Sequence, residues 1–312
     1  KEDGRCLTSQ QFAMISRRSL LIGGGALAVS RALFAAPNRI IDTHTHFYDP
    51  TRPQGVPWPS KGEKMLYRPV FPAEFKRLTA RLGITGTIAV EASPLVEDNQ
   101  WVLDLAAKEP IIVGTIGHLA PGTPGFSKQL ARFHKNRRFR GIRIAEFGPH
   151  LSETPYVEDL KLLSQADLEL DILGGPLILA QAVRISDIVP DLRIVIEHLP
   201  FDPPPNPADR LVYKHALHEL GQRPQVYIKV SNVLRRSGNV VPKDLNFYRP
   251  SLDELWNIFG ADRLVYGSNW PVSTTIAPYE DVFEVVHQYF AAKGQTVMDK
   301  FFWRNSKLAY KW

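Results

Sequence analysis

Two histidines, His44 and His46, stand one residue apart at the end of an apolar run in which residues 40–46 read Ile-Ile-Asp-Thr-His-Thr-His. Because side chains alternate between the two faces of a β-strand, this spacing places Asp42, His44 and His46 on one face. Neutral imidazole is a common ligand of divalent metal ions, so two histidines on one face can bind a single ion. An exposed pair of strand histidines would have the same pattern. The rest of the chain must decide between the two.

Eight short apolar runs alternate with longer segments of helical character along the chain. The runs are 39–46, 86–91, 111–116, 141–145, 170–173, 193–198, 225–230 and 263–266, and the clearest helical segments are 72–82, 99–108, 126–135, 157–166 and 208–220. Strand–helix alternation favours a parallel sheet, and eight such units predict a single (β/α)8 TIM barrel over residues 37–312. The alternative is a doubly wound open sheet. Its glycine-rich nucleotide turn is missing, because residues 23–25, Gly-Gly-Gly, follow no predicted strand.

Polar residues stand at the ends of six of these eight runs, where they interrupt otherwise apolar sequence. They are His44, His46, Glu91, Arg143, Glu197, His198, Lys229 and Asn269. In a barrel the carboxyl ends of the strands hold the active site. Polar groups are costly to bury there unless they are paired or bind a ligand.

His198 is the candidate for a third metal ligand beside His44 and His46. The alternative for His198 is a core histidine bonded to a backbone carbonyl. His118 and His150 lie in predicted loops and are expected to be solvated.

Glu91, Arg143 and Lys229 are the charged candidates for contact with substrate. Glu91 is either a site carboxylate or the partner of a nearby arginine. Arg143 and Lys229 are candidates for holding a substrate carboxylate, Arg143 through paired hydrogen bonds and Lys229 as a point charge. Structural ion pairs would explain both residues as well.

Taken in order, five motifs resemble those of the amidohydrolase-related metal-dependent hydrolases. They are Ile-Asp-Thr-His-Thr-His at 41–46, Val-Glu-Ala-Ser-Pro at 90–94, Phe-Arg-Gly-Ile-Arg at 139–143, Val-Ile-Glu-His at 195–198 and Tyr-Gly-Ser-Asn-Trp-Pro at 266–271. The resemblance covers residues 39–312 and is strongest to the branch that contains fuconolactonase and pyrone-dicarboxylate lactonase. It implies the barrel fold, one divalent metal ion in many members and hydrolysis of lactones or related esters. Some lactonases of this branch work without metal.

Asn269 departs from the family pattern, which commonly has Asp at this position as general base and sometimes as metal ligand. An amide cannot accept a proton near neutral pH, so the role of base is lost or has moved. Asn269 can still orient a water molecule or offer its carbonyl oxygen to a metal. Glu91 or Glu197 would then supply the base.

These observations predict a hydrolase of a small lactone or carboxylate ester, derived from a sugar or an aromatic acid. His44, His46 and His198 would hold one divalent ion, with Zn²⁺ expected, Mn²⁺ an alternative and metal-independent activity left open. Arg143 and Lys229 would bind an anionic small-molecule substrate, and Trp270 would form an apolar wall. Two alternatives remain, a non-oxidative decarboxylase on the same scaffold and an exported binding protein that has lost its catalytic base.

The first 36 residues predict export. Residues 14–22, Met-Ile-Ser-Arg-Arg-Ser-Leu-Leu-Ile, resemble a twin-arginine signal, and residues 1–13 would be an upstream extension. We therefore expect a periplasmic protein that meets the membrane only during export or through a retained leader. The single cysteine, Cys6, precedes the signal, so the barrel has no disulfide. No basic run with interleaved aromatic residues favours nucleic-acid binding.

Overall fold

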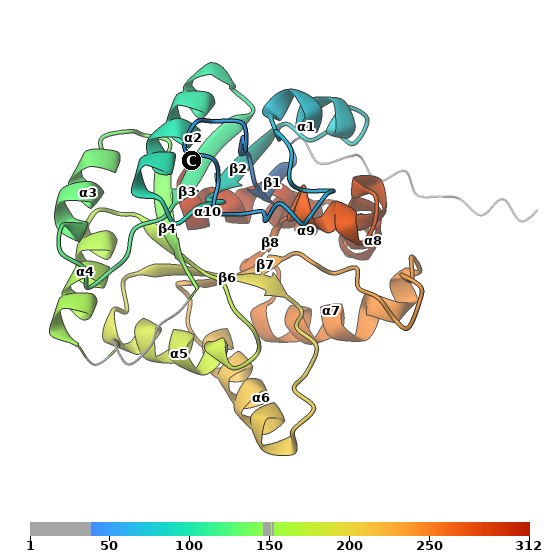
Figure 1. The fold of residues 1–312 in the computed structure, drawn as a ribbon. Helices are drawn as coiled ribbons and strands as arrows, with labels where there is room; N and C mark the ends of the chain where they lie inside the picture. Colours follow the sequence, from blue (N-terminus) through green and yellow to red (C-terminus); the bar gives the residue numbers. More distant parts are fainter. Residues whose placement is uncertain (1–38, 146–150, 152) are drawn as a thin grey trace, which may run out of the picture. The chain divides into compact units, whose positions relative to one another are not determined.

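Eight parallel strands form the barrel in the computed structural model, which describes residues 39–145, 151 and 153–312 (Figure 1). The strands are β1 (Ile41–Thr45), β2 (Gly86–Val90), β3 (Ile112–Gly117), β4 (Phe139–Ile144), β5 (Glu169–Ile172), β6 (Arg193–Leu199), β7 (Val226–Val230) and β8 (Leu264–Tyr266). Each strand pairs with its neighbour in the chain, in the order β1 to β8. This confirms the predicted (β/α)8 TIM barrel, and the strand ends differ from the expected ones by at most two residues.

The first and last strands meet at their carboxyl ends. Thr45 forms a parallel bridge with Trp270, and the backbone N–H of His46 donates to the carbonyl oxygen of Trp270 at 2.8 Å. The barrel therefore closes just beside the two histidines of β1.

Helices follow the strands and pack on the outside of the barrel (Figure 1). They are α1 (Pro72–Thr79), α2 (Val96–Lys108), α3 (Phe126–Phe133), α4 (Thr154–Gln165), α5 (Ile178–Ile188), α6 (Pro207–Gly221), α7 (Leu245–Phe259), α8 (Tyr279–Ala291), α9 (Gln295–Asp299) and α10 (Asn305–Tyr310). Capping residues at the amino end stabilise some of these helices. At α6 the side chain of Asn206 accepts hydrogen bonds from the backbone N–H groups of Ala208 and Asp209, and Pro207 occupies the first helical position.

The amino end of the barrel is covered by α10. Tyr310 and Ala309 pack with the inward-facing residues Ile41, Val195 and Val265. The guanidinium of Arg193, at the start of β6, donates to the carbonyl oxygen of Ala309 at 2.8 Å. Since this end is closed, access from solvent is left to the carboxyl ends of the strands.

The predicted twin-arginine leader lies in residues 1–38, outside the described residues, so the export route stays a prediction. Among the residues that the structure describes, no helix is both long and apolar enough to cross a membrane.

Candidate active site

A cavity of about 410 Å³ opens at the carboxyl ends of the strands. Its lining comes from seven of the eight strand ends and the loops that follow them, and consists of His46, Trp58, Glu91, Ala92, Ser93, Pro94, His118, Arg143, Ala145, Leu173, His198, Asn269 and Val272. A cavity of this size accommodates a small organic molecule. The location agrees with the position of active sites in barrels of this kind.

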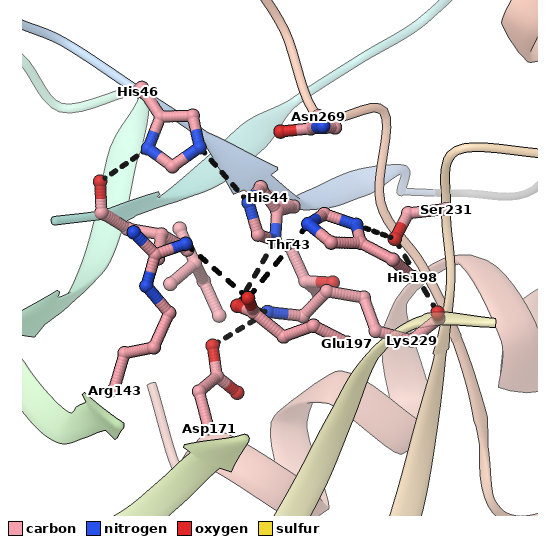
Figure 2. A network of polar contacts seen from close by, with 12 residues as sticks. Thr43, His44, His46, Arg143, Asp171, Glu197, His198, Lys229, Ser231 and Asn269 are labelled. Carbon is pink, nitrogen blue, oxygen red and sulfur yellow. Dashed lines mark hydrogen bonds and ion pairs between the residues drawn. The ribbon is translucent and has the colours of Figure 1, made fainter. Parts of the chain in front are cut away.

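His44 and His46 turn their Nε2 atoms toward each other at 3.1 Å (Figure 2). The other ring nitrogens have acceptors beside them. Nδ1 of His46 lies 3.0 Å from the carbonyl oxygen of Val90, and Nδ1 of His44 lies 3.2 Å from Oε1 of Glu197. A ring proton on each Nδ1 satisfies these acceptors and leaves both Nε2 atoms as lone-pair donors.

His198 has the same tautomer for a similar reason. The Ser231 hydroxyl donates to the carbonyl oxygen of Lys229 and lies 2.8 Å from Nδ1 of His198, so that nitrogen donates to the hydroxyl. The ring centroids of His44 and His198 are 4.6 Å apart. Nδ1 of His46 and of His198 is thus hydrogen-bonded, and Nδ1 of His44 lies beside the Glu197 carboxylate, an arrangement that favours an unprotonated Nε2 on all three rings.

This arrangement fits a divalent cation. Two unprotonated nitrogens at 3.1 Å repel each other unless a cation or a proton lies between them. Burial lowers the pKa of His46 to about 3, that of His198 to about 4 and that of His44 well below its ordinary value. The rings are therefore neutral at pH 7, which is the state that binds metal. Nδ1 donation to an oxygen acceptor is the usual support of a metal-binding histidine.

Glu197 joins the histidines as a further candidate ligand. Ligand atoms of His44, Glu197 and His198 all lie within 4.8 Å of one another. In a regular strand Glu197 and His198 would face opposite sides, but the register between β6 and β7 shifts between Ile196 and Leu199, and His198 has a φ of 64°. The irregularity lets both neighbours face the interior.

Beneath the histidines lies a fully buried group that we call the charged floor, made of Asp171, Glu197 and Lys229. The Lys229 ammonium donates to Oδ2 of Asp171 at 2.7 Å and to Oε1 of Glu197 at 3.1 Å. Tyr310 of α10 donates to Oδ1 of Asp171 at 3.0 Å. A continuous series of contacts therefore links α10 to His44. Although burial opposes ionisation, His44, Lys229 and Arg143 hold the pKa of Glu197 well below its usual range.

Alternation along the strand predicts Asp42 on the same face as His44 and His46. In the structure Asp42 does not share that face. Its carboxylate accepts hydrogen bonds from Tyr279 of α8, at 2.9 Å, and from the backbone N–H groups of His44 and Ser268. It therefore faces the helices outside the barrel. The register of β1 against β2 shifts between Asp42 and Thr45, which breaks the alternation that the prediction assumed. Asp42 still supports the site by fixing the backbone of His44.

After β2 and β3, Glu91, Ser93 and His118 line the cavity and form what we call the β2–β3 wall. Glu91 accepts from Nε of Arg143 at 2.8 Å and from the backbone N–H of Ser93 at 2.7 Å. Arg143 also donates to the carbonyl oxygen of Glu91 and to Glu197. Every nitrogen of its guanidinium is thus engaged within the protein.

Asn269 lines the cavity above His44 and His198 (Figure 2). Its amide nitrogen donates to Oδ1 of Asn232 at 2.8 Å. The bond fixes the orientation of the amide and leaves the Asn269 oxygen as an acceptor.

Of the residues expected to contact substrate, Lys229 and Trp270 lie elsewhere. Lys229 is fully buried in the charged floor, and Trp270 is 1% exposed and packs against Phe47 and Phe75. The aromatic side chain that lines the cavity is Trp58, from the proline-rich loop after β1. Trp58 is not among the residues predicted from the sequence.

His118 was expected to be a solvated loop histidine, yet it is partly buried in the cavity wall. Its position directly after β3 was the available signal. His150 lies outside the described residues.

Known proteins resemble this chain in sequence and in fold. Residues 41–312 match a family model described as amidohydrolase. An L-fucono-1,5-lactonase of Burkholderia ambifaria is 29% identical over 248 residues, covering 77% of this chain and 83% of that protein. A 4-sulfomuconolactone hydrolase of Rhizobium radiobacter is 26% identical over 250 residues, covering 78% and 80%. A zinc-bound amidohydrolase of Burkholderia multivorans has the same fold, with a TM-score of 0.77 at 22% identity over 87% of this chain and 99% of that one.

Proposed function

Because the chain belongs to the amidohydrolase family, we propose that it is a metal-assisted hydrolase that opens a small lactone. The observation that carries the proposal is the convergence of unprotonated histidine nitrogens at the base of a cavity that admits a small molecule. The lactone hydrolases among its relatives favour this function over a decarboxylase or a binding protein.

His44, His46 and His198 would hold the ion, and Glu197 is placed to join or replace one of them. Zn²⁺ fits a site with three nitrogen ligands, and Mn²⁺ is the alternative. When bound, such an ion polarises a carbonyl group and lowers the pKa of water toward neutrality, which reduces the need for a strong base.

Asn269 would orient the attacking water. Because its nitrogen is bonded to Asn232, its oxygen is free to accept a hydrogen bond from that water. The amide takes no proton itself.

Glu91 would receive the proton, since it is the one carboxylate among the described residues that line the cavity. Arg143 and the backbone N–H of Ser93 already bind this carboxylate and fix its position in the cavity wall. Glu197 is a poorer candidate because it is fully buried and its charge is held by Lys229 and Arg143.

An uncharged lactone fits this cavity better than the anionic substrate expected from Arg143 and Lys229. Lys229 is buried away from the cavity, and the guanidinium of Arg143 is engaged by Glu91 and Glu197. Among the described lining residues, no cation is left to bind a carboxylate. Trp58 would contact the apolar face of the ring in place of Trp270.

The test compares purified wild-type protein with three substituted variants on a panel of lactones, and it measures acid release and bound metal. His198→Ala should lose both metal and turnover, whereas His215→Ala, on the exposed face of α6, should lose neither. Asn269→Asp should raise turnover near neutral pH, because general-base help is worth roughly 10²–10⁴-fold where it operates. A wild-type protein that binds no metal and opens no lactone, and stays inert as Asn269→Asp, would overturn the proposal.

A further inference from the structure

We propose that His118 is a substrate-contact residue that recognises one hydroxyl group on the lactone, and that Asn99 holds it in place. The inference rests on the proposed function and specifies the substrate as a hydroxylated lactone. Three features of His118 and the residues around it carry the inference.

The first feature is a clamp on the backbone of His118. The side-chain oxygen of Asn99 accepts from the backbone N–H of His118 at 2.8 Å, and the side-chain nitrogen of Asn99 donates to the carbonyl oxygen of His118 at 2.9 Å. Asn99 comes from α2 and is 5% exposed, so both bonds are shielded from water. The backbone is fixed without any use of the imidazole.

The second feature is Gly117, which makes the clamp possible. A Cβ atom at this position would lie 2.4 Å from the side-chain oxygen of Asn99 and 2.5 Å from the ring of Phe139. Only glycine lets the amide of Asn99 approach the strand end this closely. The strand end is thus shaped to place the residue that follows it.

The third feature is the imidazole itself. It lines the cavity, and within the described part of the chain neither of its nitrogens makes a hydrogen bond to the protein. His46 differs, since its Nδ1 is bonded to backbone carbonyls in the way of a structural or metal-binding histidine. The polar atoms of His118 are therefore left for a molecule in the cavity.

The chemistry of that molecule follows from the charge of the ring. Burial lowers the pKa of His118, so the imidazole is neutral and offers one donor and one acceptor. A hydroxyl group also offers one hydrogen-bond donor and one acceptor, so it can bond to either nitrogen of the ring. A carboxylate would require a free cation, and the nearby guanidinium of Arg143 is occupied by Glu91. The wall is thus suited to a neutral, hydroxylated substituent.

The experiment measures kcat/KM for a 1,5-aldonolactone and for its singly deoxygenated analogues, with wild type and His118→Phe. The phenyl ring keeps the aromatic volume but removes both polar atoms. We expect His118→Phe to lower kcat/KM for the hydroxylated lactone roughly tenfold, which is the size of one lost hydrogen bond. For one deoxy analogue kcat/KM should stay nearly unchanged. The effect should appear mainly in KM, with bound metal unchanged.

Two further variants separate contact from general disruption. Asn99→Ala should produce a smaller loss for the same lactone, because it frees the backbone of His118 but keeps the ring. His134→Phe, at an exposed position after α3, should change nothing. If His118→Phe leaves the ratio between hydroxylated and deoxy lactones at its wild-type value, the assignment of His118 is wrong while lactone hydrolysis stands.

Failure of the proposed function has a different outcome. If wild type opens none of the lactones, calorimetric binding of the corresponding hydroxylated lactam, which resists hydrolysis, decides the matter. Weaker binding to His118→Phe, with equal binding of the deoxy lactam, would still support the contact. No binding to wild type, or equal binding to both proteins, would overturn it.

Discussion

The charged floor lies buried beneath the histidines and the β2–β3 wall lines the cavity, and the two groups satisfy their polar atoms in opposite ways. In the floor, Lys229 lies between two carboxylates and none of the three side chains is exposed. In the wall, His118 keeps both ring nitrogens free of protein partners among the described residues. The floor therefore sets the geometry of the metal-binding residues, whereas the wall is available to recognise a substrate. Substitutions should separate these two roles.

The largest effect is expected in the floor, from Lys229→Met. Removal of the ammonium leaves Asp171 and Glu197 buried without their shared cation. Breaking such a buried pair costs about 3–5 kcal/mol in the free energy of unfolding. Urea denaturation measures the change. Lys161→Met, which removes an exposed pair with Glu158, is the matched control and should cost about 0–1 kcal/mol. Equal losses in the two variants would contradict the special status of the floor.

A smaller effect is expected from Tyr310→Phe, which removes the hydrogen bond to Asp171 at the far end of the series that leads to His44. Direct partners of metal ligands are worth about 10–100-fold in metal affinity, and a more remote one should be worth roughly threefold to tenfold. Competition with a chelator measures the affinity. Tyr289→Phe removes a comparable bond to Asp253, between α8 and α7, and should leave the affinity unchanged. Identical metal affinities in wild type and Tyr310→Phe would mean that the hydrogen bond from Tyr310 to Asp171 has no influence on the metal-binding residues.

On the substrate side of the cavity, Trp58→Ala should act on KM alone. Trp58 lines the cavity and lies edge-on to His46, with ring centroids 5.6 Å apart. Loss of this surface should raise KM roughly tenfold. This change corresponds to part of the about 1.5–3 kcal/mol that burial of a large apolar side chain contributes. Steady-state kinetics and metal analysis check the result together. A fall in bound metal would show that Trp58 supports His46 rather than the substrate.

The smallest effect is expected at an ion pair near the amino end of the barrel, where Asp167 binds Arg193 and Lys311. Burial raises the pKa of Asp167, but the hydrogen bonds from Lys311 and Arg193 outweigh it and hold that pKa below its usual value. The stabilisation is therefore present above the pKa of the unfolded chain, near 4, and is lost as the pH falls through the lower folded value.

Since Asp167 is 60% exposed, Asp167→Asn should cost at most about 1 kcal/mol at pH 7. The difference from wild type should disappear at pH 2 in denaturant titrations. A difference that persisted in acid would point to packing instead of charge.

The elements of the fold were predictable because each strand is a short apolar run between amphipathic segments, and that pattern depends only on local sequence. The candidate ligands were predictable because His44, His46 and His198 end such runs. The burial of individual polar side chains, and the face of the strand on which they lie, could not be predicted. Asp42 and Glu197 lie beside breaks in register, where alternation fails. Lys229 ends a strand as Arg143 does, but it is enclosed by side chains from other strands, a tertiary property that no single strand encodes.

The contacts of Thr45 and His46 with Trp270 join residues separated by most of the barrel sequence. Loop closure over so long a separation is entropically costly, and contacts of this kind slow folding. His44 lies in the first strand and His46 directly after it, His198 lies in the sixth strand, and Asn269 lies in the segment after the last strand. The complete site consequently does not exist in a chain that has folded only its first half. Metal uptake during refolding should thus follow the final closure of the barrel, so that the ion is acquired only after the first and last strands have met.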